Sequence, residues 1–152
     1  MLKSAQSSLL KMKKSIVVFA FLNFAVYIVL FFTFRAFGLL HFSGLRMLNY
    51  ITLGVICCYQ VSHWVKQGGG YIPFLESFCT AFFTGTLSYV LFAIFIFLYS
   101  LGDPYFAKLY FNEPDGTLKL VPFIIIFFEG SAGSLIIGLI TMMYSEQYKE
   151  KV

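Results

Sequence analysis

The stretch SIVVFAFLNFAVYIVLFFTF, residues 15–34, contains twenty consecutive residues without a charged side chain. A helix needs about 20 largely apolar residues to cross the hydrocarbon core of a bilayer, which is roughly 30 Å thick. The apolar residues follow one another without the strict alternation that marks the strands of a membrane barrel. Lys13 and Lys14 precede the stretch, and Arg35 closes it. The stretch therefore predicts a retained transmembrane helix, because it is longer than the apolar region of a typical signal peptide.

The composition of the whole chain is typical of a membrane protein. Of its 152 residues, 59% are hydrophobic and 12% are charged, whereas about a quarter of the residues in soluble domains are charged. A soluble domain of this size leaves roughly a third of its surface exposed and could not hide so many apolar side chains. The net charge is +4, but the lysines form no basic patch, so nucleic-acid binding is not expected. Cys57, Cys58 and Cys79 lack the spacing of metal ligands, and we expect neither a metal nor another cofactor.

Three further apolar runs predict three more helices, at residues 47–64, 74–100 and 121–144. Short connecting segments separate the first three helices, so successive helices are expected to run antiparallel. The segment 101–120 is the most polar part of the chain and is rich in Asp-Pro, Glu-Pro and Asp-Gly turn signals. The sequence therefore predicts an all-α, polytopic membrane protein with one membrane domain over residues 1–152. Its four transmembrane helices are expected to form an antiparallel up-down bundle with an outer loop at 101–120.

The distribution of basic residues predicts the orientation of the bundle. Cytoplasmic segments of membrane proteins carry an excess of Lys and Arg. With both ends of the chain in the cytoplasm, seven basic residues lie inside and four lie outside. The inner group is Lys3, Lys11, Lys13, Lys14, Lys66, Lys149 and Lys151, and the outer group is Arg35, Arg46, Lys108 and Lys119. We therefore expect the N-terminus and the C-terminus inside.

Two carboxylates lie within apolar sequence, Glu76 in the third predicted helix and Glu129 in the fourth. A charge at the centre of a bilayer costs about 2.5–3.5 kcal/mol on insertion scales, so both residues are candidate functional carboxylates. At about 1.5 Å per residue, they are expected to lie about 18 Å apart along the membrane normal, too far for an acid/base pair. Glu76 falls near the cytoplasmic interface, within reach of Lys66, His63 or Gln60 at the end of the second helix. A structural role at the helix N-terminus is the favoured reading there.

Glu129 falls in the outer half of the fourth predicted helix. Its expected partners at that depth are Ser88 and Tyr89 on the third helix. A protonated Glu129 bonded to Tyr89 would be a structural latch between the two helices. An ionised Glu129 in contact with water would instead be a proton or cation site. The sequence leaves both readings open, because the charge of a carboxyl group depends on whether its surroundings are dry or wet.

Small residues recur at every fourth position in the third and fourth predicted helices. Stripes of this kind let two membrane helices approach each other closely. We therefore expect these two helices to pack together, with a homodimer face as the alternative. The stripe on the third helix is Ser77, Ala81 and Gly85, and that on the fourth is Gly130, Ser134 and Gly138. In the first helix, Asn23 and Tyr27 are four residues apart and are expected to face inward.

The segment GYIPFLESF at residues 70–78, followed by DPYF at 103–106, resembles a family of small bacterial inner-membrane proteins of unknown function. Members of this family, found mostly in Bacteroidetes, have four helices. They carry a Gly-aromatic-x-x-Phe-x-Glu-x-Phe signature at the start of the third helix and an Asp-Pro-x-Phe signature after it. The resemblance implies a multi-pass protein of the bacterial inner (cytoplasmic) membrane and implies no particular reaction. The positions that it marks are Phe74, Glu76, Phe78, Asp103 and Pro104.

The sequence contains no catalytic motif, so no catalytic or metal-binding residue is assigned: it has no Ser-His-Asp set, Gly-rich phosphate loop or HExxH segment. The favoured hypothesis is a non-enzymatic accessory or assembly subunit that packs against a membrane partner in the lipid bilayer. The first alternative is a small proton-coupled transporter that uses Glu129 and forms a homo-oligomer. The second is a membrane enzyme acting on lipid, with Glu76 or Asp103 as its base.

Overall fold

The computed structural model describes residues 2–39, 47–67, 74–103, 106 and 121–149. This part of the chain is entirely helical and contains no strand, so the all-α prediction is confirmed. The helices are α1 (Leu2–Ala36), α2 (Met47–Gln67), α3 (Phe74–Gly102) and α5 (Val121–Lys149). Three of them contain segments long and apolar enough to cross a membrane: Met12–Ala36, Leu75–Gly102 and Phe123–Met143. The chain therefore has the character of a multi-pass membrane protein.

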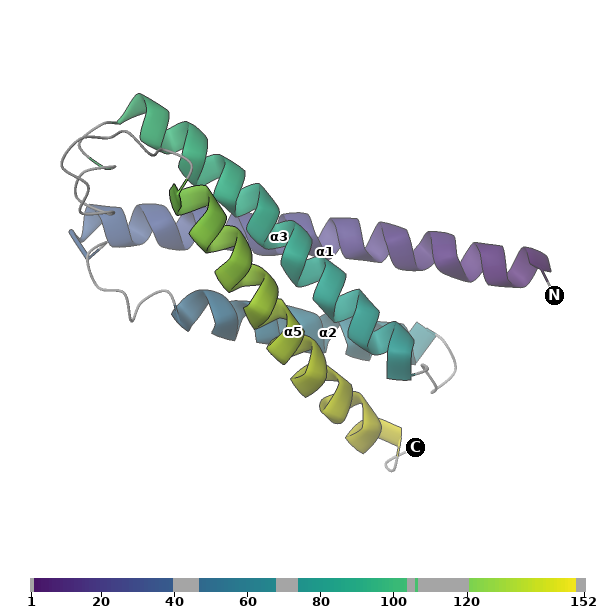
Figure 1. Ribbon diagram of the computed structural model, residues 1–152. Coiled ribbons are helices and arrows are strands. Elements are labelled where there is room, and N and C mark those ends of the chain that lie inside the picture. Colours follow the sequence, from purple (N-terminus) through teal and green to yellow (C-terminus); the bar gives the residue numbers. More distant parts are fainter. Residues whose placement is uncertain (1, 40–46, 68–73, 104–105, 107–120, 150–152) are drawn as a thin grey trace.

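Consecutive helices run in opposite directions, and α3 and α5 cross α1 and α2 obliquely (Figure 1). The most extensive interface lies between α3 and α5. Helix α1 packs mainly on α3, and α2 packs mainly on α5, whereas α2 makes smaller contacts with α1 and α3. The α3–α5 pair is therefore the centre of the bundle, with one further helix on each member of the pair.

Helix α1 begins at Leu2 rather than at residue 15, the start of the predicted membrane span. Residues 2–14 are rich in Leu, Lys, Ala, Gln and Met, which are all good helix formers, so the helix continues beyond its apolar segment. This part of α1 extends past the ends of the other helices (Figure 1). At the other end, Gly38 has a φ of 68° and donates its N–H to the Arg35 carbonyl. The Leu39 N–H reaches the Phe34 carbonyl, which completes a Schellman motif and ends the helix.

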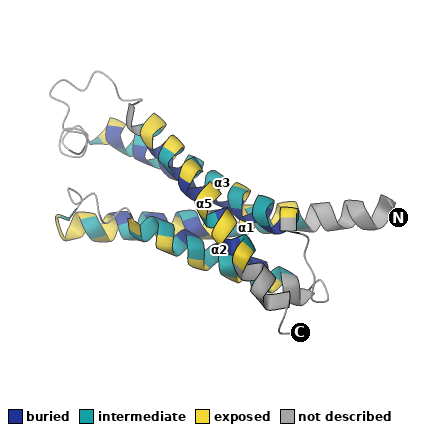
Figure 2. Ribbon diagram, turned by 60° about the horizontal axis from the view of Figure 1, so that its bottom comes forward, coloured by how far each residue is buried: buried dark blue, intermediate teal, exposed yellow. Residues whose placement is uncertain are grey.

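Exposed positions run along the outside of the helices (yellow in Figure 2), and many of them carry large apolar side chains. Val29, Val55 and Phe128, for example, expose more than 60% of their surface. Large exposed apolar faces of this kind are unusual for a soluble monomer and suit contact with lipid chains. The buried polar residues are Asn23, Gln60, Ser77, Thr80, Thr84, Ser88, Ser100, Ser134 and Thr141.

An aromatic cluster holds the C-terminal half of α1 against α3. Phe31 lies at its centre and makes edge-to-face contacts with Phe95, Tyr99 and Phe106, with ring centroids 5.5, 5.2 and 5.5 Å away. Such pairs add about 0.5–1.5 kcal/mol each to the effect of burial alone. Phe106, from the predicted outer loop, is buried in this cluster. The cluster therefore ties the segment after α3 to the end of α1.

Candidate functional site: the polar interior of the bundle

The interface between α3 and α5 brings the two stripes of small residues together. A Cβ atom on Gly85 would overlap Ser134, and one on Gly130 would overlap the ring of Tyr89. Gly138 is less crowded, because a Cβ there would lie 3.2 Å from the Phe78 ring. The two other members of the predicted stripe, Ser77 and Ala81, are also buried. The close approach of α3 and α5 thus occurs within one chain.

Gln60 of α2 bonds to two other helices from the interior. Its side chain is fully buried. The amide Nε2 donates to Ser15 Oγ of α1 at 3.1 Å, and Oε1 accepts from Thr84 Oγ1 of α3 at 3.0 Å. The amide is thereby occupied on both sides, as a buried amide in an apolar environment requires. Gln60 therefore joins α1, α2 and α3.

Three tyrosines from three helices meet in the middle of the bundle. The Tyr89 ring of α3 lies 5.1 Å from the Tyr27 ring of α1 and 5.8 Å from the Tyr50 ring of α2. The Tyr27 hydroxyl donates to the Asn49 carbonyl at 3.2 Å. Tyr50 donates to the carbonyl of Glu129 at the same distance, which connects α2 to α5. We call Tyr27, Tyr50 and Tyr89 the tyrosine layer.

Asn23 lies one turn before Tyr27 and has no exposed surface. Neither its amide nitrogen nor its amide oxygen has a hydrogen-bond partner among the described residues, and the same holds for the Tyr89 hydroxyl. Leaving a buried polar group without a partner costs about 1–3 kcal/mol. The predicted inward face of α1 is therefore present, and its amide makes no well-formed hydrogen bond in the described part of the chain, although the Tyr27 hydroxyl interacts with it.

The structure places Glu129 beside the tyrosine layer and Glu76 at the start of α3. Glu129 is half-buried and precedes Gly130, the residue that contacts Tyr89. Ser88, its other expected partner, donates instead to the Ala20 carbonyl of α1 at 3.2 Å and to the Thr84 carbonyl at 2.7 Å. Glu76 is half-buried in the first turn of α3, thirteen residues before Tyr89, or about 20 Å along the helix. The two carboxylates are therefore too far apart to act as a pair.

A second polar cluster joins the C-terminal ends of α1 and α3. Arg35 Nη2 lies 3.0 Å from Asp103 Oδ2, and its guanidinium carbon lies 5.0 Å from the centre of the Tyr99 ring. The other carboxylate oxygen, Oδ1, accepts the Phe106 N–H at 3.1 Å. Both oxygens of Asp103 are thus engaged. We call Arg35 and Asp103 the end clasp.

Of the other positions marked by the family resemblance, Phe78 packs against Gly138, whereas Pro104 and the side chain of Phe74 lie outside the described residues. Sequence reasoning did not anticipate the end clasp or the bridging role of Gln60. A signal existed for each. Arg35 and Asp103 carry opposite charges and lie at two helix ends, which are predicted to be on the same side of the membrane. Thr80, Thr84 and Ser88 recur at every fourth position of α3, which marks a polar inner face.

The described part of the chain contains no group of three His, Cys, Asp or Glu side chains able to hold a metal ion. Its buried thiol, Cys57, makes a weak hydrogen bond to the Ala81 carbonyl at 3.8 Å. Several polar side chains, among them Tyr27, Gln60 and Ser88, connect one helix to another, and the arrangement is that of a tightly packed bundle. Comparisons with protein-family models, with curated proteins and with solved structures found no match to this chain.

Proposed function

We propose that this chain is a non-enzymatic accessory or assembly subunit of the bacterial inner membrane, with four spanning helices and both ends in the cytoplasm. It would act by packing against a larger membrane partner. The proposal rests on the contacts that its polar side chains make between helices. Gln60 and the end clasp are engaged in contacts between helices, and these contacts stabilise the bundle itself. The resemblance to small four-helix inner-membrane proteins supports the same location.

Asp103 illustrates why an enzyme is the less favoured reading. A general base needs a free oxygen within hydrogen-bond reach of the proton that it removes. One oxygen of Asp103 accepts from Arg35 and the other from the Phe106 N–H. Glu76, the second candidate base, has no ion pair among the described residues, and its carbonyl accepts the Thr80 hydroxyl at 2.6 Å. The contacts of Asp103 favour a structural role for its carboxylate.

Helix α2 is the surface that we propose for the partner. It is the described helix that is not among the three apolar enough to count as a membrane span. A less apolar helix inserts less favourably on its own and benefits from a protein neighbour. One face of α2 is exposed at every fourth residue: Met47, Ile51, Val55 and Tyr59. His63 continues this face, and its ring stacks on Tyr59 with centroids 6.3 Å apart and an 11° interplanar angle.

The test is purification from native membranes in a mild detergent, followed by native mass spectrometry. The proposal predicts a stoichiometric complex with a larger membrane protein. Val55→Trp, on the exposed face of α2, should dissociate the complex, because a bulky ring there would block a close contact. The matched control is Leu98→Trp, on the exposed face of α3. A lone chain or homo-oligomer in native membranes, or equal effects of the two variants, would contradict the proposal.

A second candidate function, proton-coupled transport, is favoured by the tyrosine layer and by Asn23. Transport needs polar groups inside the bundle, and these groups come from α1, α2 and α3, with the Tyr50 hydroxyl bonded to the backbone carbonyl of Glu129 on α5. A carboxylate within a membrane helix is a default candidate for a proton site. On this reading, the amide of Asn23 would bind water or substrate in the open state.

Reconstituted vesicles with an internal pH dye distinguish this candidate from the first. Transport through Glu129 predicts that Glu129→Gln abolishes proton movement across a panel of candidate substrates, while the protein remains folded. Glu76→Gln is the matched control, because Glu76 is similarly half-buried but lies in the first turn of α3. Equal proton movement for wild type, both variants and empty vesicles would refute the transport reading.

A further inference from the structure

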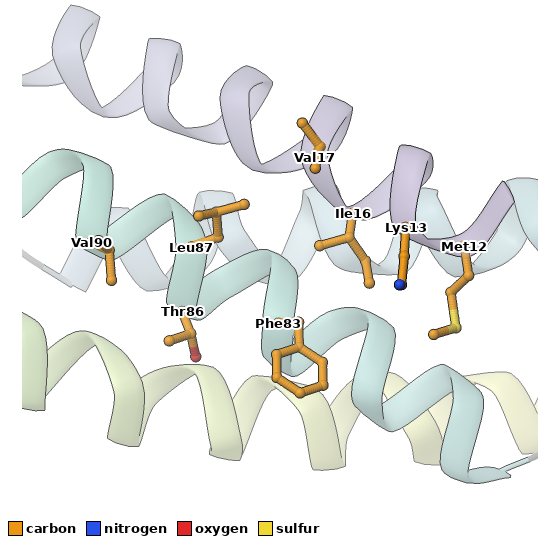
Figure 3. Close-up of a pocket in the computed structure, with 8 residues that line it drawn as sticks. All are labelled: Met12, Lys13, Ile16, Val17, Phe83, Thr86, Leu87 and Val90. Carbon is orange, nitrogen blue, oxygen red and sulfur yellow. The ribbon is translucent and has the colours of Figure 1, made fainter. Parts of the chain in front are cut away.

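An open groove of about 560 Å³ lies between α1 and α3. Its walls are almost entirely apolar and include Ile16 and Val17 of α1 and Phe83 and Val90 of α3 (Figure 3). Met12 and Lys13 lie at one end of the groove, and Val90 lies at the other (Figure 3). This volume is within the range of about 300–1,000 Å³ typical of ligand pockets in proteins.

The groove exists because the side chains that lie between α1 and α3 differ from one end of the interface to the other. Near their C-terminal ends, α1 and α3 are joined by the large aromatic rings around Phe31. Toward the N-terminus of α1, the side chains between the two helices are mostly aliphatic, such as Ile16, Val17 and Leu87, together with Phe83. These side chains do not fill the space between the obliquely crossing helices.

The charge at the end of the groove identifies the occupant. Lys13 lies at the beginning of the apolar segment Met12–Ala36 and lines the groove. A lysine at the end of a membrane span can extend its ammonium group to the headgroup layer while its methylene chain follows an apolar wall. Lys13 and the neighbouring Lys14 are both exposed, and neither has a carboxylate partner among the described residues. An apolar slot in the hydrocarbon region with a cation at its interfacial end is complementary to a lipid that carries a phosphate.

The length of the groove argues against a second helix as its occupant. From Phe83 to Val90 the groove follows seven residues of α3, or about 10 Å. A partner helix that spans the membrane crosses about 30 Å of hydrocarbon and is about 10–12 Å wide with its side chains, so it would need a much longer contact than this groove provides. A single acyl chain is much thinner and can end within the groove.

We propose that this groove binds one acyl chain of an anionic phospholipid, with the lipid phosphate held by Lys13. Val17 and Val90 contact the chain, and Lys13 selects phosphatidylglycerol-like headgroups over zwitterionic ones. Basic residues between transmembrane helices on the cytoplasmic side are a common feature of anionic-lipid sites. Lys14 is rotated by about 100° from Lys13 on the helix and does not line the groove, so it makes no such contact.

The test measures lipid retention. Full-length protein is reconstituted in bilayer discs with equal amounts of phosphatidylglycerol and phosphatidylcholine, extracted in mild detergent, and examined by native mass spectrometry. The wild type is expected to retain one phosphatidylglycerol per chain. Lys13→Gln should lower this retention about fivefold, and Lys14→Gln should leave it unchanged. Val90→Phe should lower the retention of both lipids, because the added ring fills the groove.

Three outcomes would overturn the proposal. The first is equal retention of the two lipids by the wild type, and the second is an equal loss in Lys13→Gln and Lys14→Gln. The third is a change of oligomeric state in Val90→Phe, because it would identify a second chain as the occupant. A thermal unfolding curve for each variant separates loss of lipid from loss of fold. If Val90→Phe unfolds, Val17→Phe, at the exposed rim of the groove, serves as its replacement.

Discussion

The close approach of α3 and α5 predicts that adding one methyl group has opposite effects at two glycines. Gly130→Ala places a Cβ against Cβ, Cγ and Cδ1 of Tyr89, the atoms nearest to the α3 backbone. These atoms cannot rotate away as the end of a long side chain would, so α3 and α5 must separate. Gly54→Ala is the matched change in α2, where the nearest atom is Ile137 Cδ1 at 3.6 Å, an ordinary contact distance.

The magnitudes follow from two opposing terms. Replacing Gly by Ala inside a helix stabilises it by about 0.8–1.0 kcal/mol. Overpacking a well-filled interior costs about 1–3 kcal/mol, and the upper end applies when a backbone must move. Gly130→Ala should therefore lower the free energy of unfolding by about 2 kcal/mol. Gly54→Ala should raise it by up to about 1 kcal/mol. Gly138→Ala should lie between these, since the Phe78 ring at 3.2 Å can shift by a few tenths of an ångström.

The assay is reversible unfolding in mixed micelles, with a denaturing detergent as titrant and circular dichroism as the signal. The order of stability should be Gly54→Ala, wild type, Gly138→Ala and Gly130→Ala, from the most to the least stable. The reasoning is refuted if Gly130→Ala is as stable as Gly54→Ala. That result would mean that α3 and α5 do not approach closely at Gly130.

Three further predictions use the same unfolding assay. Gln60→Leu removes hydrogen bonds to two helices and should lower the free energy of unfolding by about 1–2 kcal/mol, at about 0.6 kcal/mol or more per bond. The control is Ser62→Ala, which should be nearly neutral because the Ser62 hydroxyl bonds within α2. Equal effects of the two variants would exclude the bridging role of Gln60. Asn23→Leu should be neutral or should stabilise the protein by about 1–2 kcal/mol, because it removes a buried amide that has no well-formed hydrogen bond among the described residues. A clear loss of stability would show that the amide is satisfied. Asp103→Asn should lower the free energy of unfolding by about 0.5–1 kcal/mol at low salt and by less at high salt, because the ion pair between Asp103 and Arg35 is partly exposed. A loss of stability that is independent of salt would indicate that the charge is unimportant.

The sequence predicted those features that depend on apolar length and on residue size. Helices α2 and α3 begin at Met47 and Phe74, where the apolar runs begin. A backbone that is not helical leaves polar groups unpaired in hydrocarbon, which is costly, so apolar runs form helices. The stripes containing Gly85 and Gly130 likewise indicated the α3–α5 contact, since small residues at every fourth position have few other uses in a membrane helix. The N-terminal extension of α1 was missed, because hydropathy locates the bilayer and is silent about where a helix ends in water.

The polar contacts between helices were less predictable than the apolar packing. Ser88 was expected beside Glu129 from depth alone, but its hydroxyl bonds to Ala20 of α1. Depth fixes a position along the membrane normal and leaves the rotation of each helix undetermined. Gln60 was one of three residues expected within reach of Glu76, and in the structure its amide bonds to Ser15 and Thr84. These pairings follow from the rotation and crossing of the helices, which depend on the whole bundle.

The end clasp also constrains how the protein is made. Arg35 ends α1 and Asp103 follows α3, so 68 residues of chain separate the two charges. In the proposed orientation, with both ends of the chain in the cytoplasm, Arg35 crosses the membrane during synthesis long before its counter-ion exists, against the preference of basic residues for the cytoplasmic side. Asp103 can neutralise it only after α3 has been inserted in the same direction as α1. A chain in which α3 fails to insert would leave an arginine on the far side without its partner, a difference that a quality-control protease could detect.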